Sequence, residues 1–228
     1  MAETRDSLAY YKSKAMSNSK DIRWVSGYHG KLAAISEKGR KQWCLMIKRN
    51  LQLEKTDLLL DVGCGAGFMT IPLLPYVKTI ICLDALPSML DRITKKRNTV
   101  IKICAMADRI PLLNNSIDKI LCNSVFQYFP DYSYAERVLR EMYRVCRFNG
   151  QILIVDLPDV HKKVQYEALL SKEKTARRHL RRLFYEKVFF SKMYAEAKIF
   201  DQRVEGYLNS PFRFNALMKK KPHMPILE

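Results

Sequence analysis

Acidic residues and glycines in the first half of the chain have the spacing of a ligand-binding turn. Asp61 follows an apolar run at 58–60 and precedes Gly63, Gly65 and Gly67. Glycines at such a turn allow positive φ and let a ligand approach the backbone. A helix that begins there offers unpaired N–H groups to polar ligand atoms. Dinucleotide sites prefer G-x-G-x-x-G, so the observed G-x-G-x-G makes a nicotinamide cofactor the weaker interpretation.

A second acid, Asp84, ends the apolar run 79–83. Its two carboxylate oxygens could accept both hydroxyls of a ribose. Ligands of open α/β sheets bind beyond the carboxyl ends of the strands, which is where Asp61 and Asp84 would lie. The alternative is that either acid only caps a turn or a strand end.

The elements that would position these acids are short apolar runs separated by helix-length or loop-length connectors. Near-continuous apolar strands that alternate with helices indicate a parallel sheet covered on both faces. A largely helix-spaced apolar stripe predicts a helix over 134–146. A further helix is expected near 191–198. The predicted strands are 58–62, 79–83, 100–104, 119–123, 151–155, 203–208 and 212–219.

Four stretches together resemble class I S-adenosylmethionine (SAM)-dependent methyltransferases, in the small-molecule branch that includes the ubiquinone/menaquinone methyltransferases. They are the acidic glycine turn, the strand ending at Asp84, residues 105–112 and residues 116–131. The resemblance covers about 55–155 and, more weakly, a C-terminal hairpin. It implies a Rossmann-like α/β fold, in which a seven-stranded, mostly parallel sheet has helices on both faces and an antiparallel C-terminal hairpin.

The resemblance also implies SAM as cofactor and S-adenosylhomocysteine as product. Asp61 would hold the methionine end and Asp84 the ribose. Met106 stands where the family has an acid for the adenine amino group, so adenine would rest on apolar contacts and backbone near Ala107, with Asp108 as a substitute acid. The predicted cofactor-binding residues are Tyr11, Asp61, Gly63, Cys64, Gly65, Gly67, Asp84, Ala85, Met106, Ala107, Asp108, Asn123 and Ser124.

Catalytic side chains are harder to predict, because SAM carries an already activated methyl and a strong base is optional. For a hydroxyl acceptor, His29 and Tyr128 are the candidates for proton removal. A solvent-facing histidine and a core tyrosine are the alternatives. The Asn/Asp-Pro-Pro-aromatic motif of adenine N-methyltransferases is missing after the fourth strand, where the chain reads Asn123-Ser124-Val125-Phe126. This absence favours a small-molecule acceptor.

The net charge of +17 lies mostly in the flanks, since residues 51–150 hold thirteen Lys/Arg and ten acids. A basic excess favours anionic partners or a merely solvated face. Residues 162–182 are expected to form a basic helix whose Arg177, Arg178 and Arg181 bind a phosphorylated, nucleotide-linked or carboxylated acceptor. Two alternatives stay open: an RNA methyltransferase that binds RNA through the basic flanks, and a SAM-binding regulator without catalysis.

Length and composition favour one domain over 1–228 in a cytoplasmic protein. Its parts would be an N-terminal helical cap (1–50), a SAM-binding core (51–155), a basic helical insertion (156–190) and a C-terminal helix and hairpin (191–228). No run approaches the roughly 20 apolar residues of a membrane span, and no leader is predicted. The six cysteines lack zinc spacing, so we expect buried thiols and no metal.

Overall fold

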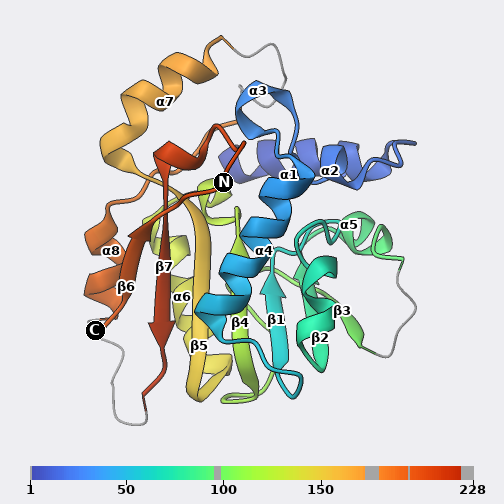
Figure 1. Cartoon of the computed structure of the whole chain (residues 1–228), viewed down its shortest axis with the longest axis vertical. Coiled ribbons are helices and arrows are strands. Elements are labelled where there is room, and N and C mark those ends of the chain that lie inside the picture. The colour runs from blue at the N-terminus through green and yellow to red at the C-terminus, as the bar shows by residue number, and fades with distance from the viewer. Residues whose placement is uncertain (1, 95–98, 173–179, 195, 222–228) are drawn as a thin grey trace.

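A seven-stranded sheet forms the centre of the molecule (Figure 1). The computed structural model describes residues 2–94, 99–172, 180–194 and 196–221. The strand order is β3-β2-β1-β4-β5-β7-β6. The strands are β1 (Leu58–Val62), β2 (Thr79–Asp84), β3 (Val100–Cys104), β4 (Ile117–Asn123), β5 (Cys146–Pro158), β6 (Lys198–Asp201) and β7 (Arg213–Lys219).

The strand directions confirm the predicted fold class. Strands β1 to β5 pair in parallel, whereas β7 runs antiparallel to both β5 and β6. The chain order reverses between β1 and β4, which are neighbours in the sheet. Such a switch point opens a crevice beyond the carboxyl ends of the strands.

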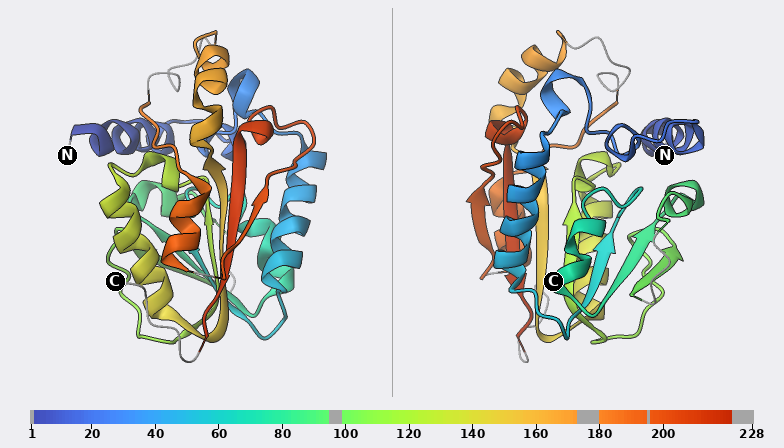
Figure 2. Two further views of the ribbon diagram at one scale, coloured as in Figure 1. Left: turned by 90° about the vertical axis from the view of Figure 1, so that its left-hand side faces the viewer. Right: turned by 45° about the vertical axis from the view of Figure 1, so that its right-hand side comes forward.

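Helices cover both faces of the sheet, and each face buries its own apolar cluster (Figure 2). One face packs against α6 (Tyr132–Val145) and α8 (Lys187–Met193), and the other against α4 (Glu37–Leu51). The buried stripe of α6 includes Val138, Leu139 and Met142, as the helical spacing predicts. Five of the six cysteines are buried and only Cys104 is exposed.

The N-terminal segment forms three helices beyond the carboxyl ends of the strands (Figure 1). They are α1 (Ala2–Met16), α2 (Ile22–Val25) and α3 (Gly30–Ala33). Helix α1 packs on α5 (Pro87–Asp91), which follows β2, and Arg92 donates to the carbonyls of Ala15 and Ser17 near the end of α1. The cap is therefore fixed to the crevice end of the sheet. None of the helices described here is long and apolar enough to span a bilayer.

The prediction of one basic helix over 162–182 was wrong. Helix α7 (Lys163–Leu170) ends after eight residues, residues 173–179 lie outside the described residues, and the chain from 180 to 186 is irregular rather than helical. Leu180, Phe184 and Tyr185 are buried there, and the backbone of Tyr185 bridges to Asp159. Phe184 packs against α7 and Tyr185 against α8, and this burial outweighs the helical propensity of the sequence.

The predicted boundaries near the C-terminus also needed correction. Helix α8 begins at Lys187, so the helix predicted near 191–198 starts too late and Lys198 opens β6 instead. Residues 203–208, predicted as a strand, form an irregular loop. This loop buries Val204 and Tyr207 against α4. The loop can approach α4 closely because residue 39 is glycine, where a Cβ would lie 2.4 Å from the Glu205 carbonyl oxygen. Tertiary packing thus produced a strand-like apolar pattern without a strand.

Candidate cofactor and acceptor site

The turn after β1 has the backbone conformation that its glycines predict. Gly63, Gly65 and Gly67 have φ values of 73°, 53° and 82°. A Cβ on Gly63 would lie 2.4 Å from a methyl of Val125, so this glycine is required by packing as well as by φ. A Cβ on Gly65 would meet no atom within 4 Å, because this residue faces an open pocket.

The end of β2 is tied to that turn by Asp84. One carboxylate oxygen accepts from the Gly65 backbone N–H at 2.8 Å and the other from the Leu86 N–H at 2.9 Å. Burial raises the pKa of Asp84, and the two backbone N–H groups oppose that rise. Both oxygens keep lone pairs for further donors, and the carboxylate lines the pocket.

Asp61 lies deeper, at the end of β1, and is 2% exposed. The pKa of Asp61 is raised to about 7. Burial is the main cause of the rise, the hydrogen bond from Thr70 opposes it, and the charge of Asp84 adds to it. A cation beside this carboxylate would lower the pKa again. The site therefore has an acid whose charge depends on what binds next to it.

The end of β4 contributes side chains that hydrogen-bond to the N-terminal segment. The Asn123 amide donates to the Tyr28 hydroxyl at 2.8 Å, and that hydroxyl lies 3.3 Å from Ser124 Oγ. Ser124 has a φ of 60°. Tyr28 is 7% exposed, and its ring packs at a tilt against that of Phe68, which lines the same pocket.

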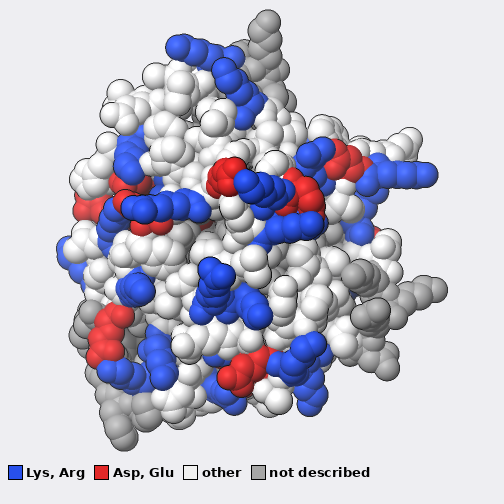
Figure 3. All heavy atoms as spheres, viewed as in Figure 1, with Lys and Arg blue, Asp and Glu red and all other residues white. Residues whose placement is uncertain are grey.

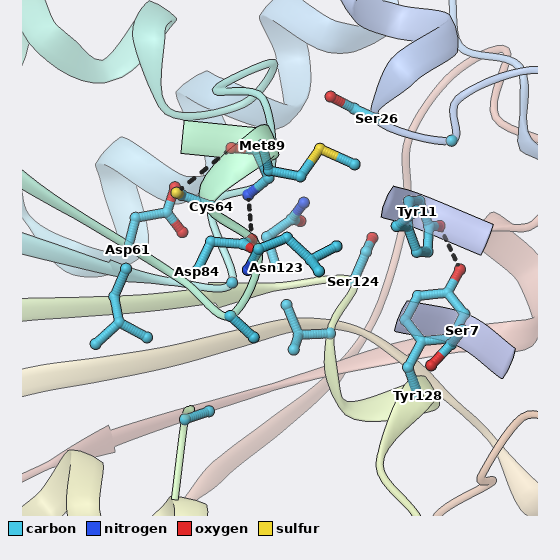
Figure 4. A pocket seen from close by; sticks show the side chains of 18 of the residues that line it. Ser7, Tyr11, Ser26, Asp61, Cys64, Asp84, Met89, Asn123, Ser124 and Tyr128 are labelled. Carbon is cyan, nitrogen blue, oxygen red and sulfur yellow. Dashed lines mark hydrogen bonds between the residues drawn. The ribbon is translucent and has the colours of Figure 1, made fainter. Parts of the chain in front are cut away.

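Helix α1 contacts the pocket through Tyr11. Its hydroxyl lies 2.7 Å from that of Tyr128, and the two rings meet edge to face at 5.3 Å (Figure 4). Figure 4 shows this tyrosine pair on one side of Ser124, with Asp61, Cys64 and Asp84 on the other. The pair thus connects the N-terminal cap to the short 3-10 helix after β4.

The pocket joins most of the predicted cofactor residues in one lining. Among the described residues that line it, the titratable side chains are acids, tyrosines and one cysteine, and none is Lys or Arg. Aromatic and apolar side chains form the rest of its wall. The predicted residues that line it are Tyr11, Asp61, Gly63, Cys64, Gly65, Asp84, Ala85, Met106, Ala107, Asn123, Ser124 and Tyr128.

The remaining predicted residues lie elsewhere. Gly67 lies in the glycine turn but lines a neighbouring cleft instead. Asp108 accepts from the Tyr134 hydroxyl at 3.2 Å and pairs with Arg137 at 3.5 Å, so it reaches the pocket only through Tyr134. Arg181 lines a separate groove beside α7. Arg177 and Arg178 lie outside the described residues.

His29 is not among the pocket residues. It precedes α3, and its Nε2 lies 3.3 Å from the Tyr10 hydroxyl, with the Trp24 ring 5.8 Å away. Of the two candidates for proton removal, only Tyr128 lines the pocket. The side chain of Tyr128 is therefore the one that the fold brings beside the predicted cofactor residues.

Several lining residues were missed from the sequence. They are Ser7, Leu8, Ser26, Gly27, Tyr28, Phe68, Met69, Leu83, Leu86, Met89, Ala105, Val125, Phe129 and Tyr134. Residues 24–30 contain Trp24 and Tyr28, but nothing in that run indicates that Tyr28 meets Ser124. Only the return of the N-terminal segment across the strand ends brings the two together.

Comparison with known proteins agrees with this arrangement. Residues 60–154 match the family model described as a methyltransferase domain. An uncharacterized methyltransferase-like protein of Schizosaccharomyces pombe is 34% identical over 104 residues, covering 45% of this chain and 39% of that protein. The uncharacterized methyltransferase YcgJ of Bacillus subtilis is 30% identical over 117 residues, covering 49% of this chain and 45% of its own length. The alignments thus span less than half the length of these curated relatives.

Solved structures share the fold at low identity. A phosphoethanolamine N-methyltransferase of Haemonchus contortus, in complex with phosphoethanolamine and S-adenosylhomocysteine, aligns with a TM-score of 0.73 and 15% identity, over 97% of this chain and 50% of that one. The N-methyltransferase NodS of Bradyrhizobium japonicum, in complex with S-adenosylhomocysteine, aligns with a TM-score of 0.66 and 12% identity, over 97% and 100%. Residues 60–154 therefore match a methyltransferase domain, and the chain has the fold of methyltransferases that were solved with S-adenosylhomocysteine.

Proposed function

We propose that this chain transfers a methyl group from SAM to an oxygen or nitrogen of a small-molecule metabolite. One observation carries the proposal: the pocket has two acids and a glycine turn at one end and an uncharged aromatic wall at the other. The first end suits the polar groups of SAM, and the second suits an acceptor aligned with the methyl. SAM supplies an activated methyl, so the chain's task is to bind, align and exclude water.

The cofactor residues are assigned by their free acceptors and donors. Asp84 would accept the ribose hydroxyls, because its oxygens keep lone pairs beside the Gly65 and Leu86 contacts. Asp61 would face the ammonium group of the methionine moiety, which favours its ionised form. Met106 and Ala107 would contact adenine. This fit leaves the aromatic wall near Tyr128 for the acceptor.

The acceptor itself is proposed to be anionic, with its negative group away from the methylated atom. No described residue of the pocket lining is Lys or Arg, so the reacting end meets no cation among them. Cationic side chains lie outside this pocket, in the separate groove beside α7 that is lined by Lys163, Arg181 and Arg182. Phosphoethanolamine, which the Haemonchus contortus enzyme binds, has a phosphate and an amine separated in this way.

The large positive charge supports RNA as a second acceptor class only weakly. In the view of Figure 3, Lys and Arg side chains are scattered over the face and interspersed with Asp and Glu. They do not form an unbroken basic stripe along this face, which an extended nucleic acid backbone would follow.

The test is methyl transfer from labelled SAM into a cell extract, separated by size and repeated after RNase treatment, with phosphoethanolamine as a defined acceptor in parallel. Label in the small-molecule fraction that resists RNase supports the proposal. Label in a large, RNase-sensitive fraction rejects it in favour of RNA. Label in no fraction, together with binding of S-adenosylhomocysteine, favours a SAM-binding regulator.

A further inference from the structure

Ser124, which lines the pocket, and Asp156, which accepts its hydrogen bond, both have left-handed backbones although neither is glycine. Ser124 follows β4 with a φ of 60°, and Asp156 in β5 has a φ of 65°. They are neighbours across the sheet, because the Ser124 N–H donates to the Val155 carbonyl at 3.0 Å. Such conformations are unfavourable for residues with a Cβ and often occur at functional sites. The pair therefore requires an explanation beyond folding.

Asp156 is surrounded by donors. Its carboxylate accepts from Ser124 Oγ at 2.5 Å, from Tyr207 Oη at 3.1 Å and from Gln202 Nε2 at 3.1 Å. Arg213 Nε forms an ion pair with it at 3.6 Å. Each of these four partners of the carboxylate carries a hydrogen, as an acceptor-only, ionised carboxylate requires. The hydrogen of Ser124 is consequently directed away from the pocket.

Arg213 is an unusual counter-ion because its side chain is completely buried. The Tyr166 ring lies 4.8 Å from the guanidinium carbon, and none of the three guanidinium nitrogens has a hydrogen-bond partner within the described parts of the chain. Such a buried pair seldom adds stability over apolar packing, since both ions lose their water. We attribute the pair to a different role: the charge on Asp156 holds the Ser124 hydroxyl hydrogen in the Ser124–Asp156 hydrogen bond.

The hydrogen bonds have one direction. Asn123 donates to Tyr28, and the Tyr28 hydroxyl stands beside Ser124, which donates to Asp156. With its only hydrogen given to Asp156, Ser124 Oγ can act toward the pocket only as an acceptor. Figure 4 shows the Ser124 side chain between Asn123 and the Tyr11–Tyr128 pair, close to where the proposed acceptor would lie.

We propose that Ser124 Oγ accepts a hydrogen bond from the nucleophile, and that Asp156 and Arg213 are positioning residues that fix this polarity. The proposal rests on the proposed function and narrows it. The methyl acceptor must bear an N–H or O–H at the reacting atom, as a primary or secondary amine or a hydroxyl does. A protonated amine would also meet no Lys or Arg among the lining residues that the structure describes.

The test needs no identified substrate. Sinefungin resembles S-adenosylhomocysteine but carries an amine where SAM carries its methyl, so this amine directs N–H groups from the position of the methyl toward the acceptor side of the pocket. Calorimetry with both ligands gives the ratio of their affinities for each variant. Because a hydrogen bond to a charged group contributes about 1.5–3 kcal/mol, we expect Ser124→Gly to lower the preference for sinefungin about tenfold or more.

Ser124→Gly removes the hydroxyl and suits the positive φ, so the fold should persist. Asn149→Gly is its matched control, since Asn149 has a φ of 63° outside the pocket lining and should leave the ratio unchanged. Asp156→Asn keeps the shape but lets its amide donate to Ser124, which should lower the ratio with little change in S-adenosylhomocysteine affinity.

Each outcome decides a separate point. An unchanged ratio in Ser124→Gly overturns the assignment of Ser124. A ratio that falls in Ser124→Gly but stays at the wild-type value in folded Asp156→Asn overturns the positioning role of Asp156. If the wild-type protein binds neither ligand, the proposed function itself is rejected.

Discussion

The carboxyl ends of β1 and β2 differ in construction from those of β4 and β5, although residues of β1, β2 and β4 line one pocket. At β1 and β2 the polar contacts are local: Asp84 accepts from the backbone of Gly65 and Leu86, and Asp61 accepts from Thr70. At β4 and β5 the contacts join side chains from remote segments, such as Tyr28 to Asn123 and Ser124. The cofactor half is thus a local backbone structure, whereas the acceptor half depends on tertiary packing.

A change at Gly63 should have the largest effect, because this residue touches both halves. Gly63→Ala would place a Cβ 2.4 Å from Val125 in a backbone with a φ of 73°. We expect a loss of about 3 kcal/mol in the free energy of unfolding, from left-handed strain and overpacking together. Urea denaturation measures it, with Gly65→Ala as the control whose Cβ meets no atom. Equal losses in both variants would contradict the packing argument.

Asp84→Ala should separate cofactor binding from folding. The carboxylate stands at the pocket, so its loss removes ribose contacts while the Gly65 and Leu86 N–H groups can turn to water. We expect S-adenosylhomocysteine to bind about a hundredfold more weakly, with a small change in melting temperature. Calorimetry and thermal unfolding measure the two effects. Unchanged affinity would remove the ribose assignment.

The pH dependence should distinguish the two halves further, because it comes from Asp61. Its pKa of about 7 means that the apo carboxyl is mostly protonated at pH 6 and mostly ionised at pH 8. If bound ligand requires the ionised form, affinity for S-adenosylhomocysteine should rise about tenfold over this range. Asp61→Asn should abolish the rise. A flat wild-type profile would exclude Asp61 as the partner of the ammonium group.

The same raised pKa has an opposite consequence for the stability of the apo protein. The folded state holds the Asp61 proton more tightly than the unfolded chain does, so this residue's contribution to the unfolding free energy is full below about pH 4 and is lost as pH rises toward 7. Denaturation of wild type and Asp61→Asn across this range isolates the contribution. A contribution that grows with pH would contradict the burial of Asp61 as its cause.

The smallest effect is expected from Tyr11→Phe, which tests the contact between the cap and the acceptor half. It removes one partner of the 2.7 Å hydroxyl contact with Tyr128 and leaves the ring packing. We expect dissociation of S-adenosylhomocysteine to become about threefold faster. Stopped-flow fluorescence measures the rate, and Tyr10→Phe is the matched control. A larger change in the dissociation rate of Tyr10→Phe would mean that Tyr10, and not Tyr11, makes the contact that slows ligand release.

The sequence by itself determined the sheet core and the cofactor end of the pocket. The apolar runs around 58–62, 79–84 and 100–104 and the glycine spacing after Asp61 are local features, because strand burial and positive φ act on consecutive residues. A short stretch of residues therefore contains the information, and those strands were predicted nearly to the residue.

Only the tertiary structure decided the acceptor end and the C-terminal third. Residues 180–186 are irregular rather than helical, with Leu180 and Phe184 buried, and the loop 203–208 buries Val204 and Tyr207 because it packs on α4. The series of hydrogen bonds from Asp156 through Ser124 to Tyr28 includes a contact between residues 96 positions apart in the sequence. Contacts over such separations arise from packing and the exclusion of water, and no periodicity along the chain records them.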